Sequence, residues 1–159
     1  MSCPLCAASA GPFGPGAARG ALRCETCALT FVPPSRHLSP EAERARYAEH
    51  NNDPRDPGYR EFLDRLLAPL AARLSKGAEG LDFGCGPGPA ASVMLRERGF
   101  KARDWDPYFF PDEGALERDY DFIVCTEVFE HLREPGETLR RLDGLLRPGG
   151  WLGVMTMRL

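Results

Sequence analysis

The sequence lacks any long hydrophobic run. None of its apolar stretches approaches the roughly 20 residues that a membrane-spanning helix needs. The first residues, 1–4, also lack the charged and apolar regions of a secretion signal. The sequence therefore argues against a membrane protein, and we predict a cytoplasmic location with no membrane partner.

An excess of positive charge is also missing. The formal net charge is -3, so the protein as a whole has no basic field of the kind that a general nucleic-acid binder needs. Hydrophobic residues make up 43% and charged residues 27% of the chain, which excludes a fibrous or wholly disordered protein. With 159 residues, the chain has room for one main domain and one small additional unit.

Cysteine, in contrast, occurs in a regular pattern near the N-terminus. Cys3 with Cys6 and Cys24 with Cys27 form two Cys-x2-Cys pairs with a spacing typical of four-cysteine zinc sites. Each pair can present two thiolates to one tetrahedral ion, and residues 1–36 are too rich in Gly and Pro to build an apolar core. We predict a structural zinc ribbon; two disulfides or unpaired thiols are the alternatives.

Residues 37–78 carry two helical patterns. The Ser-Pro-Glu sequence at 39–41 is a helix-start signal, and it predicts a helix to about Glu49. Leucine and aromatic residues then recur at helical spacing over 59–74, which predicts an amphipathic helix. We expect a kink at Pro69 because proline removes a helical hydrogen bond.

Short strands alternate with helices from Gly80 onward, the pattern of a parallel sheet with crossover helices. The expected strands are 81–83, 100–105, 121–126 and 151–157, and the expected helices are 90–98 and 138–146. Cys85 and Cys125 lie in this region and are interpreted as small core residues, because free cysteine is commonly buried. The predicted fold class is α/β.

A glycine-rich loop joins the first of these strands to the following helix. Gly84, Gly86 and Gly88 stand at alternate positions, which allows a sharp turn and a close ligand contact. Pro89 occupies a position where a dinucleotide-binding loop has glycine, which disfavours phosphate binding. Asp106 ends the next strand, where a carboxylate can accept both hydroxyls of a ribose.

Three sequence blocks, taken in order, resemble the class I S-adenosylmethionine-dependent methyltransferases over residues 79–159. They are LDFGCGPG at 81–88, YDFIVCTEVFEHL at 120–132 and LLRPGGWL at 145–152. The resemblance implies a Rossmann-like, mostly parallel sheet with flanking helices. This domain would be preceded by a zinc ribbon, 1–36, and by a helical linker or lid, 37–78.

The resemblance also implies how S-adenosylmethionine is held. The glycines would lie beneath its methionine part, Asp82 would anchor its amino group, and Asp106 would hold the ribose. Asp82 can instead stabilise the turn, and the aromatic residues at 105–110 either wall the adenine or pack in the core. The implied cofactor-binding residues are Asp82, Gly84, Cys85, Gly86, Gly88, Asp106, Pro107, Thr126 and Glu127.

Glu130 and His131 are the candidate catalytic residues. They follow the strand 121–126 at the sheet edge where ligands usually bind, and His131 can accept a proton near neutral pH. A helix-start turn with solvated charges is the alternative interpretation. Residues 50–52 and Tyr59 either contact substrate as part of a lid or belong to a polar loop between helices.

Two segments depart from the family pattern. The nine residues between Phe110 and Tyr120 are too few for a third strand with its crossover helix, so that strand is expected to be short or missing. The sequence also stops after the fifth strand, where the family normally adds two more. We therefore expect 151–157 to form an exposed sheet edge that is prone to association.

The sequence predicts a methyltransferase that uses S-adenosylmethionine and acts on a small-molecule or RNA acceptor. Residues 1–50 hold 5 Arg against 4 Glu, a bias too weak to require RNA. A non-catalytic zinc-ribbon binding module with a vestigial cofactor domain is the alternative function.

Overall fold

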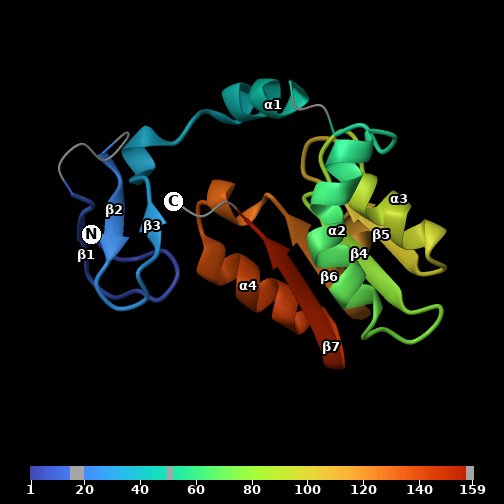
Figure 1. Cartoon of the computed structure of the whole chain (residues 1–159). Helices are drawn as coiled ribbons and strands as arrows, with labels where there is room; N and C mark the ends of the chain where they lie inside the picture. The colour runs from blue at the N-terminus through green and yellow to red at the C-terminus, as the bar shows by residue number, and fades with distance from the viewer. Residues whose placement is uncertain (15–19, 50–51, 157–159) are drawn as a thin grey trace.

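The computed structural model describes residues 1–14, 20–49 and 52–156. A small N-terminal sheet is followed along the chain by two helices and then by a larger sheet with its own helices (Figure 1). None of the described helices is long and apolar enough to cross a membrane.

The N-terminal unit, residues 1–36, is a small antiparallel ribbon. Its strands, in the order β1-β2-β3, are β1 (Ala10–Pro12), β2 (Leu22–Cys24) and β3 (Thr30–Phe31). A short 3-10 helix, η2 (Pro34–Arg36), follows the last strand. Strands of two or three residues are too short to show an alternating pattern in the sequence, which explains why none was predicted here.

Two helices connect the ribbon to the larger sheet. Helix α1 (Pro40–Ala48) begins after Ser39, whose hydroxyl accepts the backbone N–H of Ala42 at 3.3 Å, and it confirms the predicted helix. Helix α2 (Pro57–Ala71) begins after Asp56, whose carboxylate accepts the N–H of Gly58 at 2.8 Å. It starts two residues earlier and ends three residues earlier than the apolar pattern indicated.

The larger sheet has four parallel strands in the order β5-β4-β6-β7. They are β4 (Glu79–Phe83), β5 (Lys101–Trp105), β6 (Tyr120–Thr126) and β7 (Leu146–Met155). This arrangement confirms the predicted α/β class with a Rossmann-like parallel sheet. Strand β7 begins earlier than the expected Trp151, because Leu146 already pairs with Tyr120 before an irregularity in the register. The expected last residue of that strand, Met157, lies outside the described residues.

Helices cover both faces of the sheet. The buried side chains of α2 and α3 (Ala90–Glu97) pack with Phe122 and Val124 of β6. The alternate residues of β6, Ile123 and Cys125, face the opposite side. That side is covered by α4 (Pro135–Gly144) and by the 3-10 helix η3 (Glu113–Leu116). Helix α4 starts three residues before the predicted position, at Pro135.

The two outer strands agree with the departures noted in the sequence. Between β5 and β6 the structure forms η3 instead of a further strand, so β5 lies at one end of the strand order. Strand β7 lies at the other end, and its Trp151 and Val154 side chains are 44% and 39% exposed. Association through this edge stays a prediction.

Candidate functional site

The loops that follow β4 and β5 meet at the carboxyl edge of the sheet. The backbone N–H of Gly86 donates to Asp106 Oδ2 at 3.0 Å. The other oxygen, Oδ1, accepts the N–H groups of Tyr108 at 2.8 Å and Phe109 at 3.1 Å. Pro107, which lies between Asp106 and Tyr108 in the chain, is exposed. The two elements expected to hold the cofactor therefore face each other, and the Asp106 carboxylate fixes the glycine loop, residues 84–88.

The three glycines are also required by the protein's own packing. Gly84 and Gly86 have positive φ angles of 75° and 65°, which glycine adopts without strain. A Cβ atom on Gly84 would lie 2.6 Å from the Val128 side chain, and one on Gly88 would lie 2.3 Å from the carbonyl oxygen of Asn52. The segment before α2 and the segment after β6 thus lie directly against the glycine loop.

Asp82 is the most deeply buried carboxyl group of this region, with 1% exposure. Its Oδ2 accepts the backbone N–H of Ser92 at 3.1 Å, which ties β4 to the first turn of α3. Its Oδ1 is buried and has no partner among the described residues. Burial, together with the nearby Asp104 carboxylate, raises the pKa of Asp82 to about 7. One oxygen therefore has a structural role, while the other can accept a hydrogen bond from a ligand.

The segment after β6, residues 127–134, carries the candidate catalytic side chains and is called the β6 loop here. Thr126 ends the strand, and Glu127 follows in a left-handed conformation with φ of 55°. Burial and the neighbouring Glu130 raise the pKa of Glu127. Glu130 itself is exposed and accepts the hydroxyl of Thr156 at 2.8 Å. These acidic groups give the loop a negative character.

Helix α1 covers the loops after β5 and β6. The Glu43 carboxylate accepts the hydroxyl of Tyr108 at 3.0 Å and the guanidinium of Arg133 at 3.0 Å. One turn later on the same helix, Tyr47 packs with its ring centroid 6.2 Å from that of Tyr108 and 5.3 Å from that of His131. Sequence reasoning missed Glu43, Tyr47 and Arg133. Glu43 and Tyr47 are four residues apart, so the sequence places them on the same face of a helix. This spacing occurs in many helices and does not by itself indicate a site.

Several residues that were weighed as ligand contacts belong to the core. Trp105 is 9% exposed and stacks on Phe83 with ring centroids 4.6 Å apart, which supports the packing interpretation for this aromatic residue. Cys85 and Cys125 are buried, and burial raises the pKa of both thiols. These two cysteines are therefore protonated side chains of the sheet unit, by which we mean helix α2 and the larger sheet with its helices, residues 57–156. The cofactor contact predicted for Cys85 stays a prediction.

The segment expected to act as a lid reaches the site through its later residues. Burial raises the pKa of Tyr59 to about 12, and the carboxylates of Asp82 and Glu127 act in the same direction. Tyr59 and Asn52 are thus placed near the predicted cofactor site. His50 and Asn51, named with them in the sequence analysis, lie outside the described residues.

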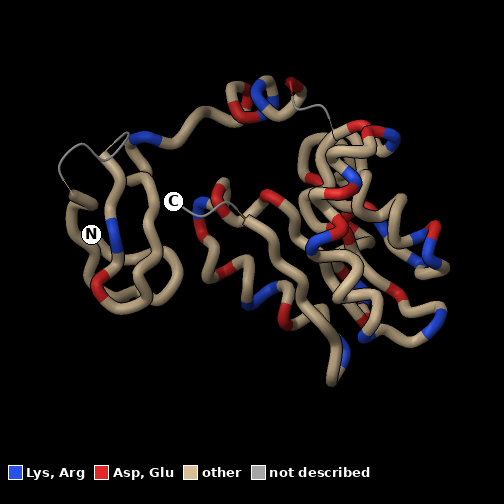
Figure 2. Tube along the Cα trace, in the orientation of Figure 1, with Lys and Arg blue, Asp and Glu red and all other residues tan. Residues whose placement is uncertain are grey.

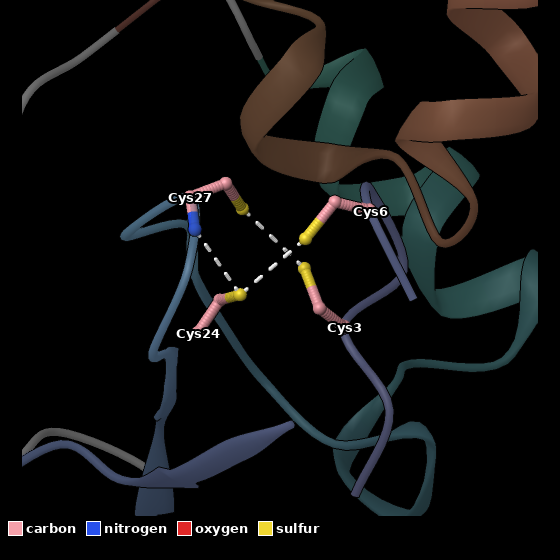
Figure 3. A group of neighbouring side chains, drawn as sticks. All are labelled: Cys3, Cys6, Cys24 and Cys27. Carbon is pink, nitrogen blue, oxygen red and sulfur yellow. Dashed lines mark hydrogen bonds between the residues drawn. The ribbon is translucent and has the colours of Figure 1, made fainter. Parts of the chain in front are cut away.

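The four N-terminal cysteines form one cluster, with their sulfur atoms within 4.8 Å of one another (Figure 3). The Sγ atoms of Cys3 and Cys27 are 3.6 Å apart, and those of Cys6 and Cys24 are 3.5 Å apart. Tetrahedral zinc with Zn–S bonds of about 2.3 Å implies sulfur atoms about 3.8 Å apart. The donor set therefore fits one tetrahedral ion, and all four cysteines are free thiols.

The two cysteine pairs adopt the same turn. Ala7 and Ala28, each directly after the second cysteine of a pair, both have φ of 60°. Backbone N–H groups point at the first cysteine of each turn: Leu5 donates to Cys3 Sγ at 3.4 Å, and Cys27 and Thr26 donate to Cys24 Sγ at 3.4 Å. The N–H groups of Cys27 and Thr26, together with the neighbouring thiols of Cys6 and Cys27, lower the pKa of Cys24, which favours the thiolate that a metal requires.

Comparison with known proteins decides the family of the sheet unit. The sequence pattern of the methyltransferase domain family matches residues 47–158. The chain belongs to this family. The match covers the glycine loop, Asp106 and the β6 loop of the methyltransferase domain, and it excludes the ribbon and most of α1.

Relatives of the methyltransferase domain are similar over only part of their length. The ubiquinone biosynthesis O-methyltransferases of Aeromonas salmonicida (strain A449) and Serratia proteamaculans (strain 568) are 27% and 28% identical over 92 residues, which is 58% of this chain. The chain spans 39% and 38% of the length of these two relatives.

Solved structures similar to the methyltransferase domain include two S-adenosyl-L-homocysteine complexes. They are SAM-dependent methyltransferases from Thiobacillus denitrificans and Geobacter sulfurreducens, 21% and 20% identical to this chain, with TM-scores of 0.48 and 0.45. In both comparisons the similarity covers 74% of this chain and 55% of the other chain.

Proposed function

We propose that the chain is an S-adenosylmethionine-dependent methyltransferase whose cofactor lies against the surface that the glycine loop and Asp106 form together. One observation carries this proposal: Gly86 N–H donates to Asp106 Oδ2 at 3.0 Å, so the carboxylate suited to a ribose stands directly against the loop. Membership of the methyltransferase domain family supports the class of reaction.

The bound cofactor would supply a methyl group on a sulfonium sulfur, from which the thioether S-adenosylhomocysteine is a good leaving group. The acceptor's lone pair would bond to the methyl carbon as the carbon–sulfur bond breaks, with release of S-adenosylhomocysteine and the acceptor's proton. Asp82 Oδ1 would accept a hydrogen bond from the ammonium group of the methionine part, and Asp106 would accept from the ribose hydroxyls. His131 would take the acceptor's proton.

We further propose a small molecule with a hydroxyl group as the methyl acceptor. The relatives named as O-methyltransferases suggest oxygen as the receiving atom. Glu127 and Glu130 lie close together on the β6 loop beside the proposed site, and their carboxylates would repel the phosphates of RNA. The same negative charge favours a cationic sulfonium over a neutral thioether.

The cysteine cluster is proposed to hold zinc in a structural role. Four sulfur ligands fill a tetrahedral coordination sphere and leave no open position for catalysis. The short strands of the ribbon bury almost no apolar side chain, so the ion would supply the free energy that orders this unit.

The test of the cofactor site compares two aspartates that each accept a backbone N–H. Asp106 accepts from Gly86 at the carboxyl edge of the sheet, and Asp121 accepts from Glu79 at 2.8 Å at the amino end. We expect Asp106→Ala to weaken S-adenosylhomocysteine binding by roughly ten- to a hundredfold, as for loss of a hydrogen bond to a charged group. Asp121→Ala should leave this affinity unchanged, measured by calorimetry.

Unchanged affinity in Asp106→Ala would show that the ribose assignment is wrong. Turnover is then measured as S-adenosylhomocysteine release with panels of hydroxyl-bearing small molecules and of RNA. Turnover with RNA alone would overturn the proposed acceptor class. Cofactor binding without turnover on either panel would favour the non-catalytic binding module.

A further inference from the structure

The first cysteine turn, residues 3–6, packs directly on the start of helix α4. The backbone N–H of Gly136 donates to the carbonyl oxygen of Pro4 at 3.2 Å. A Cβ atom on Gly136 would lie 2.7 Å from the carbonyl oxygen of Leu5 and 2.9 Å from that of Pro4. Glycine at this position therefore permits a backbone-to-backbone contact that no larger residue allows without displacement.

The N-terminal part of the chain also holds the β6 loop that leads into α4. Arg133, within this loop, donates to the carbonyl oxygen of Leu38 at 2.8 Å and to Glu43 at 3.0 Å. The ring of His131 packs edge-on against Tyr47. At its other side, Val128 lies against Gly84 of the glycine loop. The candidate catalytic loop is thus supported by the ribbon and α1 on one side and by the cofactor loop on the other.

The ribbon and the sheet unit have separate supports. The two clusters of buried apolar residues in the described chain begin at Leu63 and lie wholly within the sheet unit, which includes α2. The cysteine cluster lies in residues 3–27, outside both of them. Loss of the metal should therefore release the contact at Gly136 while leaving the sheet folded.

We infer that the cysteine ribbon positions the β6 loop through the contact between Pro4 and Gly136. Gly136 is then a positioning residue, which acts on Glu130 and His131 through the start of α4, and the metal keeps the first cysteine turn in the shape that fits it. This inference rests on the proposed function in one respect, that the β6 loop is the catalytic loop. It gives the ribbon a role inside the methyltransferase domain in addition to any contact with substrate.

Helix α4 offers a matched pair of variants for the test. Gly136→Ala and Gly144→Ala make the same change in the same helix, but a Cβ on Gly144 meets nothing within 4 Å. Both variants are loaded with zinc, and hydrogen exchange is followed for the amides of residues 128–136. We expect exchange there to be at least about tenfold faster in Gly136→Ala. Exchange in Gly144→Ala should match the unsubstituted protein.

A second measurement uses the unsubstituted protein and remains decisive if Gly136→Ala fails to fold. Zinc is removed with a chelator, and the same amides are followed beside those of residues 122–125 in the centre of the sheet. We expect residues 128–136 to lose protection and residues 122–125 to keep it. The NMR signals of the His131 ring should shift both on zinc removal and in Gly136→Ala, which a purely structural role remote from the site would not cause.

The outcomes separate this inference from the proposed function. Unchanged exchange in residues 128–136 after zinc removal would overturn the inference, and so would a zinc-loaded, folded Gly136→Ala that matches Gly144→Ala. Failure of the unsubstituted zinc protein to bind S-adenosylhomocysteine would overturn the proposed function. The exchange measurements do not depend on that ligand, so they decide the inference in either case.

Discussion

The ribbon and the sheet unit of this chain are ordered in different ways. Among the described residues of the ribbon, the buried apolar ones are Cys3, Ala10 and Cys24, and two of these belong to the cysteine cluster itself. In the sheet unit, apolar side chains from helices and strands form a buried cluster on each face of the sheet. The described part of the ribbon thus has a cysteine cluster in the place where the sheet unit has apolar cores.

The ribbon and the sheet unit also differ in the number of charged side chains that they carry. Charged side chains are sparse along the ribbon, whereas both signs are mixed over the helices and strands of the sheet unit (Figure 2). Ion pairs such as that between Arg147 and Asp121, at 2.9 Å, link neighbouring strands at the amino end of the sheet. The sheet unit therefore has cross-strand ion pairs in addition to its apolar core.

The largest effect is expected from a substitution that unfolds the ribbon and leaves the sheet unit folded. Cys24→Ser should abolish zinc binding, which contributes about 10 kcal/mol or more in structural zinc sites, and should unfold residues 1–36. Cys125→Ala is the matched control, because Cys125 is fully buried in the sheet and far from the cluster in sequence. Metal content and amide exchange measure the result. Protection of the ribbon amides in a zinc-free Cys24→Ser protein would contradict it.

The next largest effect is expected from a substitution that lowers the stability of the sheet unit and leaves the ribbon unchanged. Leu67 of α2 is fully buried, and Leu67→Ala should lower the free energy of unfolding of the sheet unit by about 2–5 kcal/mol through lost burial and a residual cavity. Zinc content should not change. Leu38→Ala, at a residue that is 41% exposed, should have a small effect in the same denaturant titration. Equal destabilisation by both variants would argue against the assigned core.

The smallest effect is a pH dependence of the sheet unit that comes from Asp82. The pKa of Asp82 is raised to about 7 in the folded protein, whereas an unfolded aspartate releases its proton near pH 4. The folded state therefore binds the proton more tightly, and this contribution to stability is lost as pH rises from about 4 to about 7. Relative to Asp82→Asn, we expect the free energy of unfolding to fall by on the order of 1–3 kcal/mol between pH 5 and pH 7.

Denaturant titrations of both proteins between pH 5 and pH 8.5 measure this difference. Asp121→Asn is the control, because the backbone N–H of Glu79 and then Arg147 lower the pKa of Asp121. Its difference from the unsubstituted protein should be constant above pH 5. A constant difference for Asp82→Asn as well would show that Asp82 is ionised in the folded state.

Much of the sheet unit could be predicted from sequence, because its elements carry periodic apolar patterns. The buried run in β6 and the amphipathic pattern of α2 each identified an element within a few residues. Boundaries were less predictable where Pro and Gly adjoin an element. The Pro-Gly pair at 135–136 begins α4, and the Pro-Gly-Gly sequence at 148–150 lies inside β7.

The contacts across the site could not be predicted, because they join segments that are distant in sequence. The sequence placed Asp106 and the glycine loop near each other, and the bond between Gly86 and Asp106 agrees with that expectation. The sequence did not indicate that the Glu43 carboxylate would accept hydrogen bonds from both Tyr108 and Arg133. None of the three residues belongs to a motif that would single it out. The roles of the predicted site residues stay predictions.

The contact between Pro4 and Gly136 has a consequence for how the chain folds during synthesis. The residues of the cysteine cluster precede the larger sheet in the chain and lie close together in sequence, so the proposed ion could bind before any strand of that sheet is synthesised. Helix α4 is synthesised after the ribbon and after the first three strands of the sheet, so it could pack on a ribbon that is already folded. A segment that is synthesised before the sheet would thus serve as a template for a helix that is synthesised after most of it.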